Sequence, residues 1–286
     1  MQTQKLSYRT VAALGFLVYF FSYAMRLDYS ASLVAIVSDL GITNTMASAA
    51  VTGSFITYGA GQIVCGFIGD RISPIKMITA AMLGTVLVNI AVSFCSNIAA
   101  ITMLWSLNGI CQAMLWPPLT RFFSEQIDSE RFSDAITVVA LASSVGTIFV
   151  YIFVPFILEF TVWRNVFRCM AVLGTLIIFI WCFSTRKVPM HSIAGSSEKI
   201  REHTYNKASA WKLICVSGLI PVFLIIIIHG ALRDGIQTWL PMVANEKYGL
   251  NESSSVLSTA VLPALSIVSV IFANLLYHRL GNELKA

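Results

Sequence analysis

The sequence predicts an all-α protein that crosses a membrane many times. Hydrophobic residues make up 57% of the chain and charged residues only 12%, and the mean hydropathy is +0.77. A soluble domain carries about 25% charged residues, so a soluble fold is excluded. The apolar residues also gather into long runs, and a helix needs about 20 such residues to cross a bilayer. Together these observations predict a polytopic membrane protein.

Eight apolar segments are expected to span the membrane. They cover residues 10–37, 46–69, 75–94, 98–120, 133–159, 163–185, 211–243 and 254–278. Lys5 and Arg9 before the first segment superficially suggest a signal peptide. That segment is too long for one and contains Arg26 and Asp28, so we interpret it as a spanning helix.

Basic residues predict how the chain is oriented. They gather in the joins that follow the even-numbered segments, above all in the polar stretch 186–210. By the positive-inside rule the N-terminus and this stretch are cytoplasmic. We expect a plasma membrane location, in the first place a bacterial inner membrane. The predicted organisation is an N-terminal six-helix bundle over 1–185, a cytoplasmic linker over 186–210, and the first two helices of a C-terminal bundle over 211–286.

A weak internal repeat relates the two ends of the chain. Three pairs recur at offsets of 207 or 208 positions: Arg26 with Arg233, Gly41 with Gly249, and Arg71 with Arg279. The last two segments therefore look like a second copy of the first two, with the same orientation. Two-halved transporters with parallel repeats bind substrate between the halves, near mid-membrane. The repeat implies four further helices after Ala286, and it argues against a compact transporter that is complete as written. We expect the 286-residue chain alone not to transport.

Two arginines lie inside apolar segments. On a helix, Arg26 shares one face with Tyr19 and Tyr23, at spacings of seven and three residues. A cation at mid-membrane costs about 2.5 to 3.5 kcal/mol, so it must face protein or a watery cavity. Arg233 holds the matching place in a later segment. We expect the two guanidinium groups to face each other across a translocation path and to hold an anion, because their planar forks suit phosphate oxygens.

A competing interpretation makes both arginines structural, paired with Asp28 or Asp234. Residues one or two positions apart do not face each other on a helix. Pairing of each arginine with its own neighbour is therefore predicted to be poor, while pairing with another helix stays open.

Three other polar residues are candidates for the substrate site. His229 lies one turn before Arg233 and could add a titratable charge there, or it could pack through a hydrogen bond. Asn108 and Gln112 are four apart on one segment. They could donate to substrate hydroxyls, or equally to neighbouring helices.

The stretch from Gly66 to Lys76 resembles the loop signature between helices two and three of the major facilitator superfamily. The motif residues are Gly66, Gly69, Asp70, Arg71 and Lys76. The glycines would let helices approach closely, while Asp70 and Arg71 would latch a cytoplasmic gate. Ser73 and Pro74 depart from the pattern, which predicts a weaker latch. The alternative is an ordinary charged turn.

Further stretches resemble the organophosphate:phosphate antiporters of that superfamily, over essentially the whole chain. The matching stretches are Gly109 to Pro118 with Arg121, then Ser129-Glu130-Arg131, the Tyr19–Tyr23–Arg26 face, and Arg233 to Trp239. The resemblance implies twelve helices and exchange of a phosphorylated metabolite for inorganic phosphate by alternating access. It also implies that the two arginines grip the phosphate from opposite halves.

The substrate stays open. Leu27 and Ser143 stand where some family members carry lysine and histidine, which points away from glycerol 3-phosphate or to a weaker phosphate grip. Apart from Asp28 and Asp234, the segment interiors lack the carboxylate of a proton relay, which favours antiport. The alternatives are a cation-coupled carrier of carboxylated sugars or other organic anions, and a sensor that reads extracellular sugar phosphate without transporting it.

No enzyme, cofactor or metal site is expected. The six cysteines are scattered without a CxxC motif, and neither a nucleotide-binding loop nor a Ser/His/Asp set appears. The net charge of +5 is not a nucleic-acid signal, because most basic residues lie between apolar segments. The expected partners are a small anionic substrate, organic or inorganic phosphate, and the lipid bilayer, with the protein as a monomer.

Overall fold

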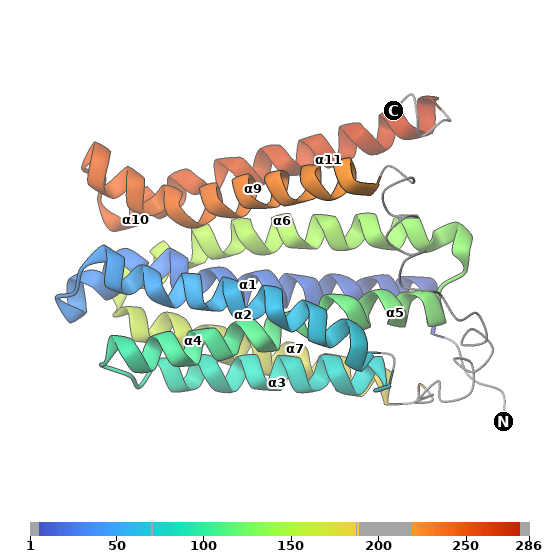
Figure 1. The fold of residues 1–286 in the computed structure, drawn as a ribbon, viewed down its shortest axis with the longest axis horizontal. Coiled ribbons are helices and arrows are strands. Elements are labelled where there is room, and N and C mark those ends of the chain that lie inside the picture. Colours follow the sequence, from blue (N-terminus) through green and yellow to red (C-terminus); the bar gives the residue numbers. More distant parts are fainter. Residues whose placement is uncertain (1–5, 70, 187, 189–218, 281–286) are drawn as a thin grey trace.

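The computed structural model describes residues 6–69, 71–186, 188 and 219–280. All secondary structure in this part is helical, which confirms the predicted class. The helices run along the long axis of the molecule (Figure 1). Their bounds are α1 Tyr8–Leu40, α2 Asn44–Gly69, α3 Pro74–Val92, α4 Ile98–Ala113, α5 Trp116–Gln126, α6 Ser129–Phe160, α7 Trp163–Thr185, α9 Leu219–Tyr248, α10 Glu252–Thr259 and α11 Val261–Leu280.

Six membrane spans are found among the described residues, from length and apolarity. They are α1, α2, α3, the α4–α5 pair, α6 and α7, and they match the first six predicted segments. The seventh and eighth predicted segments correspond to α9 and to α10 with α11, which are not among the six. Residues 211–218 of the seventh segment, and almost all of the predicted linker 186–210, lie outside the described part. The domain boundaries and the membrane orientation therefore stay predictions.

The fourth predicted segment is two helices. Helix α4 ends at Ala113, and α5 begins at Trp116 with Pro117 and Pro118 directly behind it. Proline lacks an N–H and clashes with the preceding turn, so it breaks a helix interior but is well placed at a helix start. The eighth segment is divided in the same way at Ala260, shortly before Pro263.

The two glycines paired by the internal repeat have the same backbone conformation. Gly41 follows α1 with φ of 61° and Gly249 follows α9 with φ of 64°, both in the left-handed region. Each N–H donates to the carbonyl oxygen four residues earlier, Val37 in one case and Asn245 in the other. Only glycine adopts this conformation without steric cost. The two paired glycines therefore end α1 and α9 in the same way.

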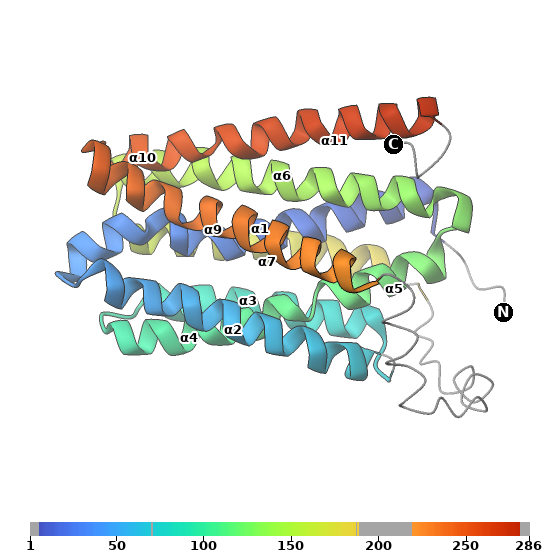
Figure 2. The same cartoon turned by 45° about the horizontal axis from the view of Figure 1, so that its top comes forward.

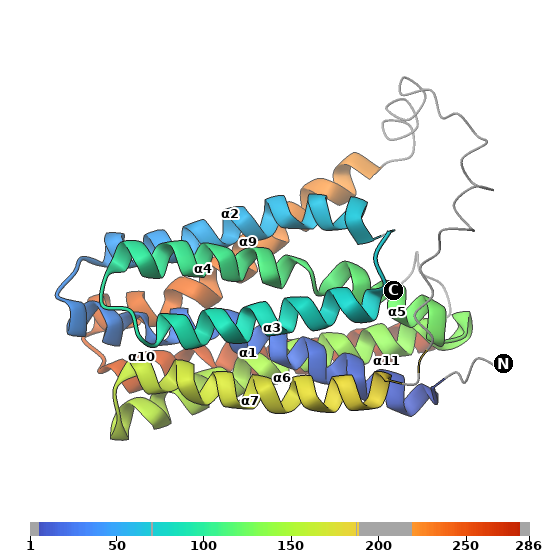
Figure 3. The ribbon, with the colours of Figure 1, turned by 90° about the horizontal axis from the view of Figure 1, so that it is seen from below.

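The helices pack mainly in pairs. Helix α1 packs against α6, α2 against α4, and α3 against α7. Figure 3 shows α2 beside α4, with α3 on the other side of α4. Helix α9 lies against α1, while α10 and α11 lie against α6, so that α6 separates α11 from α1 (Figure 2). Helices from the C-terminal part of the chain therefore pack directly against α1 and α6 of the N-terminal part.

Close helix approach occurs at some of the glycines. A Cβ on Gly109 in α4 would collide with the Ser54 carbonyl oxygen in α2, and one on Gly146 in α6 would lie 3.0 Å from the Phe20 carbonyl oxygen in α1. Such contacts explain why α2–α4 and α1–α6 pack closely, since small residues let membrane helices approach.

Candidate functional site

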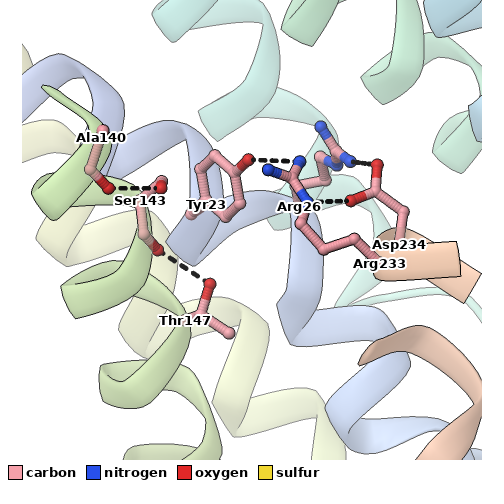
Figure 4. A network of polar contacts seen from close by, with 7 residues as sticks. All are labelled: Tyr23, Arg26, Ala140, Ser143, Thr147, Arg233 and Asp234. Carbon is pink, nitrogen blue, oxygen red and sulfur yellow. Dashed lines mark hydrogen bonds and ion pairs between the residues drawn. The ribbon is translucent and has the colours of Figure 1, made fainter. Parts of the chain in front are cut away.

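Arg26 in α1 and Arg233 in α9 meet at one carboxylate. Nη2 of Arg26 donates to Oδ2 of Asp234 at 2.8 Å, and Nε of Arg233 donates to Oδ1 at 3.0 Å. Nη2 of Arg233 also donates to the Tyr23 hydroxyl at 3.1 Å. Figure 4 shows these four side chains converging between the two helices. We call Tyr23, Arg26, Arg233 and Asp234 the arginine network.

Arg26 is held in place by aromatic rings. Its guanidinium carbon lies 5.5 Å from the ring centre of Tyr23, 5.0 Å from that of Tyr58 and 5.8 Å from that of Phe55. An aromatic face attracts a cation, most strongly where water is excluded. The Tyr19 ring extends this wall, with its centre 5.5 Å from that of Tyr23. The predicted tyrosine–arginine face of α1 is thus assembled in the structure.

The arginine network has unequal access to solvent. The side chains of Arg26, Asp234 and Arg233 are 13%, 28% and 44% exposed. Two guanidinium groups on one carboxylate leave one positive charge unmatched within the network. Nε of Arg26 is buried and has no hydrogen-bond partner among the described residues. The arrangement therefore has spare donor capacity and spare positive charge for an anion.

The pairing of Arg233 differs from the sequence prediction. Arg233 and Asp234 are adjacent on α9, where pairing was expected to be poor, yet they form an ion pair. The arginine side chain is long enough to fold back onto its neighbour, and the carboxylate sits between the two guanidinium groups. Asp28 does not pair with Arg26: its Oδ1 accepts from the Tyr29 N–H at 2.8 Å. The sequence analysis considered Asp234 only as a structural partner of Arg233 and did not include it in the site.

On the α6 side of the network, two side-chain hydroxyl groups donate to backbone carbonyl oxygens of their own helix. Ser143 donates to the Ala140 carbonyl oxygen at 2.7 Å, and Thr147 to that of Ser143 at 2.8 Å (Figure 4). Both hydroxyl protons are thereby used within α6. Ser143 therefore adds no charge on this side of the network.

Asn108 and Gln112 lie in the interior of the helix bundle rather than at the arginine network. Gln112 accepts from the Ser22 hydroxyl at 2.7 Å, and Nδ2 of Asn108 donates to the Met25 carbonyl oxygen at 2.9 Å. Both side chains are almost fully buried. These bonds correspond to the interhelical alternative that the sequence left open. The side chain of His229 lies outside the described part.

The predicted gating motif is only partly described. Asp70 falls outside the described residues, and Arg71 and Lys76 are exposed. A Cβ on Gly66 or Gly69 would have no described atom within 4 Å. The expected close approach of helices at these two glycines is therefore wrong for the described part, where the faces they lie on are open.

Arg121 holds the α2–α3 join, a role that sequence reasoning did not assign. Its Nη1 donates to the carbonyl oxygens of Gly69 and, at 3.2 Å, of Ile72. Its Nε donates to Glu125 at 2.9 Å. A spacing of four residues suits an ion pair on a helix, but Arg121 and Glu125 lie beyond the predicted segment 98–120. The contact with the join depends on how α5 packs.

Comparisons with known proteins agree with this architecture. A family model described as "Major Facilitator Superfamily" matches residues 12–286. The chain is 22% identical over 187 residues to a "Probable hexose phosphate transport protein" of Chlamydia trachomatis, which covers 65% of this chain and 41% of the relative. It is 24% identical over 150 residues to a protein of the same name from Chlamydia pneumoniae, covering 52% and 33%. The matched part is thus less than half the length of these relatives.

A solved structure supports the fold. The crystal structure of a D-xylose-proton symporter superimposes with a TM-score of 0.72 at 14% identity, covering 94% of this chain and 68% of that one. At this identity the likeness concerns the fold alone.

Proposed function

The chain belongs to the major facilitator superfamily, and from this premise we propose that it carries an organic phosphate of the sugar-phosphate class across the membrane in exchange for inorganic phosphate. Transport proceeds by alternating access, with Arg26 and Arg233 holding the phosphoryl group. The observation that carries the proposal is the convergence of these arginines, from opposite ends of the chain, on a single carboxylate.

The Asp234 carboxylate occupies the place that phosphate oxygens would take. A phosphate monoester carries up to two negative charges on three terminal oxygens, and two guanidinium forks can match both charges and oxygens. When substrate binds, Asp234 withdraws from one or both arginines. In the absence of substrate it keeps them together and limits their repulsion.

The position of the arginines links binding to movement. Arg26 belongs to α1, and Arg233 to α9, which packs against α1. An anion bound to both holds the two segments together, and its release lets them separate. This is the element that alternating access requires, because binding must favour one arrangement of the helices over another.

Two further features support a sugar phosphate. The chlamydial relatives carry the name hexose phosphate transport protein. The half-buried Tyr19 ring lies beside Tyr23 of the arginine network and offers an apolar face against which a sugar ring can pack. We propose Tyr19, Tyr23, Arg26 and Arg233 as the substrate-binding set.

One observation favours a second candidate, an organic-anion carrier. The anion between the arginines in this structure is a carboxylate, so a carboxylated sugar has the same means of binding. The two candidates differ in whether phosphate or carboxylate is preferred.

Exchange in proteoliposomes, measured on a twelve-helix version of the protein that contains this chain, tests the proposal. Vesicles loaded with inorganic phosphate are offered labelled hexose 6-phosphate, glycerol 3-phosphate or a hexuronate, and uptake of the label is measured. In a separate experiment, binding of the same compounds to the purified protein is measured by calorimetry. Arg26→Lys and Arg233→Lys keep the charge but lose the fork, and we expect each to lower hexose phosphate affinity at least about tenfold. Arg168→Lys is the control, because Arg168 is an exposed residue bonded to Asn165, outside the network.

The outcomes separate the candidates. Phosphate exchange that is lost in both network variants and kept in the control supports the proposal. Uptake of the hexuronate without phosphate exchange would move the assignment to an organic-anion carrier. Binding of phosphates without flux would contradict transport and favour a sensor.

A further inference from the structure

A second polar cluster lies inside the packed helices, separate from the arginine network. Asp28 in α1 is fully buried, and its Oδ2 has no hydrogen-bond partner among the described residues. Ser32, one turn later, is fully buried as well, and its hydroxyl has no described partner. The amide oxygens of Asn89 in α3 and Asn108 in α4 are in the same situation. Buried polar groups are nearly always paired, so four unpaired groups in one region require an explanation.

Packing brings Asp28 and Asn89 to the same level. A Cβ on Gly174 in α7 would lie 2.5 Å from Met25 Cε and 2.8 Å from Val86 Cγ2, so these two side chains meet against α7. Asp28 follows Met25 by three residues on α1, and Asn89 follows Val86 by three on α3. The two helices run in the same direction (Figure 1). Three residues are a little less than one helical turn, so Asp28 and Asn89 both follow this contact at about the same level of the bundle.

Hydrogen bonds fix how the two amides point. Nδ2 of Asn89 donates to the Thr85 carbonyl oxygen at 3.0 Å, and Nδ2 of Asn108 to that of Met25 at 2.9 Å. A carbonyl oxygen only accepts, so in both residues the NH₂ group must face it and the amide oxygen must face elsewhere. The bond to Met25 also sets Asn108 beside the turn of α1 that carries Asp28. The cluster thus presents a carboxylate oxygen and two amide oxygens, with the Ser32 hydroxyl as its only unused donor.

We propose that Asp28, Ser32, Asn89 and Asn108 form a binding site for a small monovalent cation, a proton or Na⁺. Oxygen ligands suit a hard cation, and a proton on Asp28 would supply the donor that the amide oxygens lack. One monovalent cation neutralises the one carboxylate. A divalent ion would leave a buried positive charge unmatched, which is strongly unfavourable in an apolar interior.

Few charged residues lie on the helices around Asp28. Helices α2 and α4 contain no charged residue, α3 has only Lys76 in its first turn, and the charges of α6 and α7 lie near their ends. The fixed charge nearest to Asp28 along α1 is Arg26 of the arginine network. The uncharged titratable groups of the described helices α1 to α7 are Tyr8, Tyr19, Tyr23 and Tyr29 on α1, Tyr58 and Cys65 on α2, Cys111 on α4, Tyr151 on α6, and Cys169 and Cys182 on α7. Asp28 is therefore the only carboxylate placed mid-helix in this described region of α1 to α7.

The site goes beyond phosphate exchange. Asp28 lies two residues after Arg26 on the same helix, so a cation bound at Asp28 and an anion bound at Arg26 act on one turn of α1. Occupancy of one site then changes the affinity of the other, and by linkage the effect is reciprocal. The cation site does not depend on which anion is carried.

Two measurements on the purified full chain test the site, and neither uses transport. The first is thermal unfolding in NaCl against choline chloride at equal ionic strength. The second is infrared difference spectroscopy of the protonated carboxyl band while the pH is raised. Both are made on the wild type, on Asp28→Asn, and on Asp39→Asn as a control, because the Asp39 carboxylate is exposed and paired with Arg164 at 2.6 Å.

We expect the wild type and Asp39→Asn to show one of two signals that Asp28→Asn lacks. A rise in unfolding temperature specific to Na⁺ identifies sodium, and a carboxyl band that disappears at high pH identifies a proton. A wild type with neither signal, or a signal that persists in Asp28→Asn, overturns the proposal. If Asp28→Asn fails to fold, a wild type with neither signal still overturns the proposal. If the wild type gives the cation signal but the exchange experiment shows no phosphate exchange, the proposed function is contradicted and the cation site is not.

Discussion

The carboxylate of Asp234 in α9 lies 2.8 Å from the guanidinium of Arg26 in α1, 208 residues earlier in the chain. The same carboxylate also receives Arg233, its own neighbour. A single internal anion therefore joins two cations that come from different ends of the sequence. Any external anion that binds both arginines must compete with it.

Asp234→Asn should tighten phosphate binding. The amide keeps the shape of the side chain but removes the competing negative charge, and a gain of about 1.4 kcal/mol corresponds to a tenfold lower Kd. Titration calorimetry with inorganic phosphate measures this. Asp39→Asn, at the surface pair with Arg164, should leave the Kd unchanged. Weaker binding in Asp234→Asn would show that the carboxylate positions the arginines rather than competing with substrate.

Tyr23→Phe should weaken binding modestly. The Tyr23 hydroxyl accepts from Nη2 of Arg233 at 3.1 Å, and a hydrogen bond to a charged group contributes about 1.5 to 3 kcal/mol. Part of this is recovered by bonding to substrate or water, so we expect an affinity loss of roughly 3- to 30-fold. Tyr8→Phe is the matched control, because the ring alone contacts Arg131 there. If Tyr23→Phe binds phosphate as tightly as the control Tyr8→Phe, the Tyr23 hydroxyl does not contribute to binding.

Gly146→Ala should destabilise the contact between α1 and α6. The added Cβ would lie 3.0 Å from the Phe20 carbonyl oxygen and 3.1 Å from Tyr23 Cβ, so the helices must move apart. Overpacking of this kind costs about 1 to 3 kcal/mol. A lower unfolding temperature is expected for Gly146→Ala, while Gly59→Ala, with no described atom within 4 Å, should match or slightly exceed the wild type. Equal melting of both variants would contradict the close packing.

Arg121→Lys should loosen the join between α2 and α3. Lysine cannot reproduce the fork that reaches the Gly69 and Ile72 carbonyl oxygens and Glu125 together. Hydrogen exchange measured by mass spectrometry should be faster in peptides covering residues 69–73. The exposed Arg71 provides the control variant Arg71→Lys, for which we expect no change. Unchanged exchange in Arg121→Lys would mean that the α2–α3 join holds without this side chain.

Much of the fold could be predicted from the sequence because each membrane helix is specified locally. An apolar run long enough to cross a bilayer must satisfy its backbone internally, so it forms a helix whatever its neighbours. The breaks at Trp116 and Ala260 were missed, although Pro117, Pro118 and Pro263 were visible in the sequence. There the apolar pattern continued through residues whose backbone chemistry interrupts a helix.

The site could be predicted only in part. A face of Tyr19, Tyr23 and Arg26 follows from helical spacing, and the structure assembles it. The partner of Arg26 does not follow from spacing, because α9 and α1 meet through tertiary packing. The bonding of Gln112 depends in the same way on which helix lies opposite.

By itself the sequence determined that this protein is a helical membrane protein, that two arginines lie in apolar segments, and that they stand in matching places of a repeat. These properties depend on composition and on spacing within single helices. Only the tertiary structure decided that Asp234 bridges the arginines, that Arg121 holds the α2–α3 join, and that Asp28 is fully buried without an ion-pair partner among the described residues. Those relationships join helices that are distant in the chain, and packing of the helices rather than local propensity sets which side chains meet.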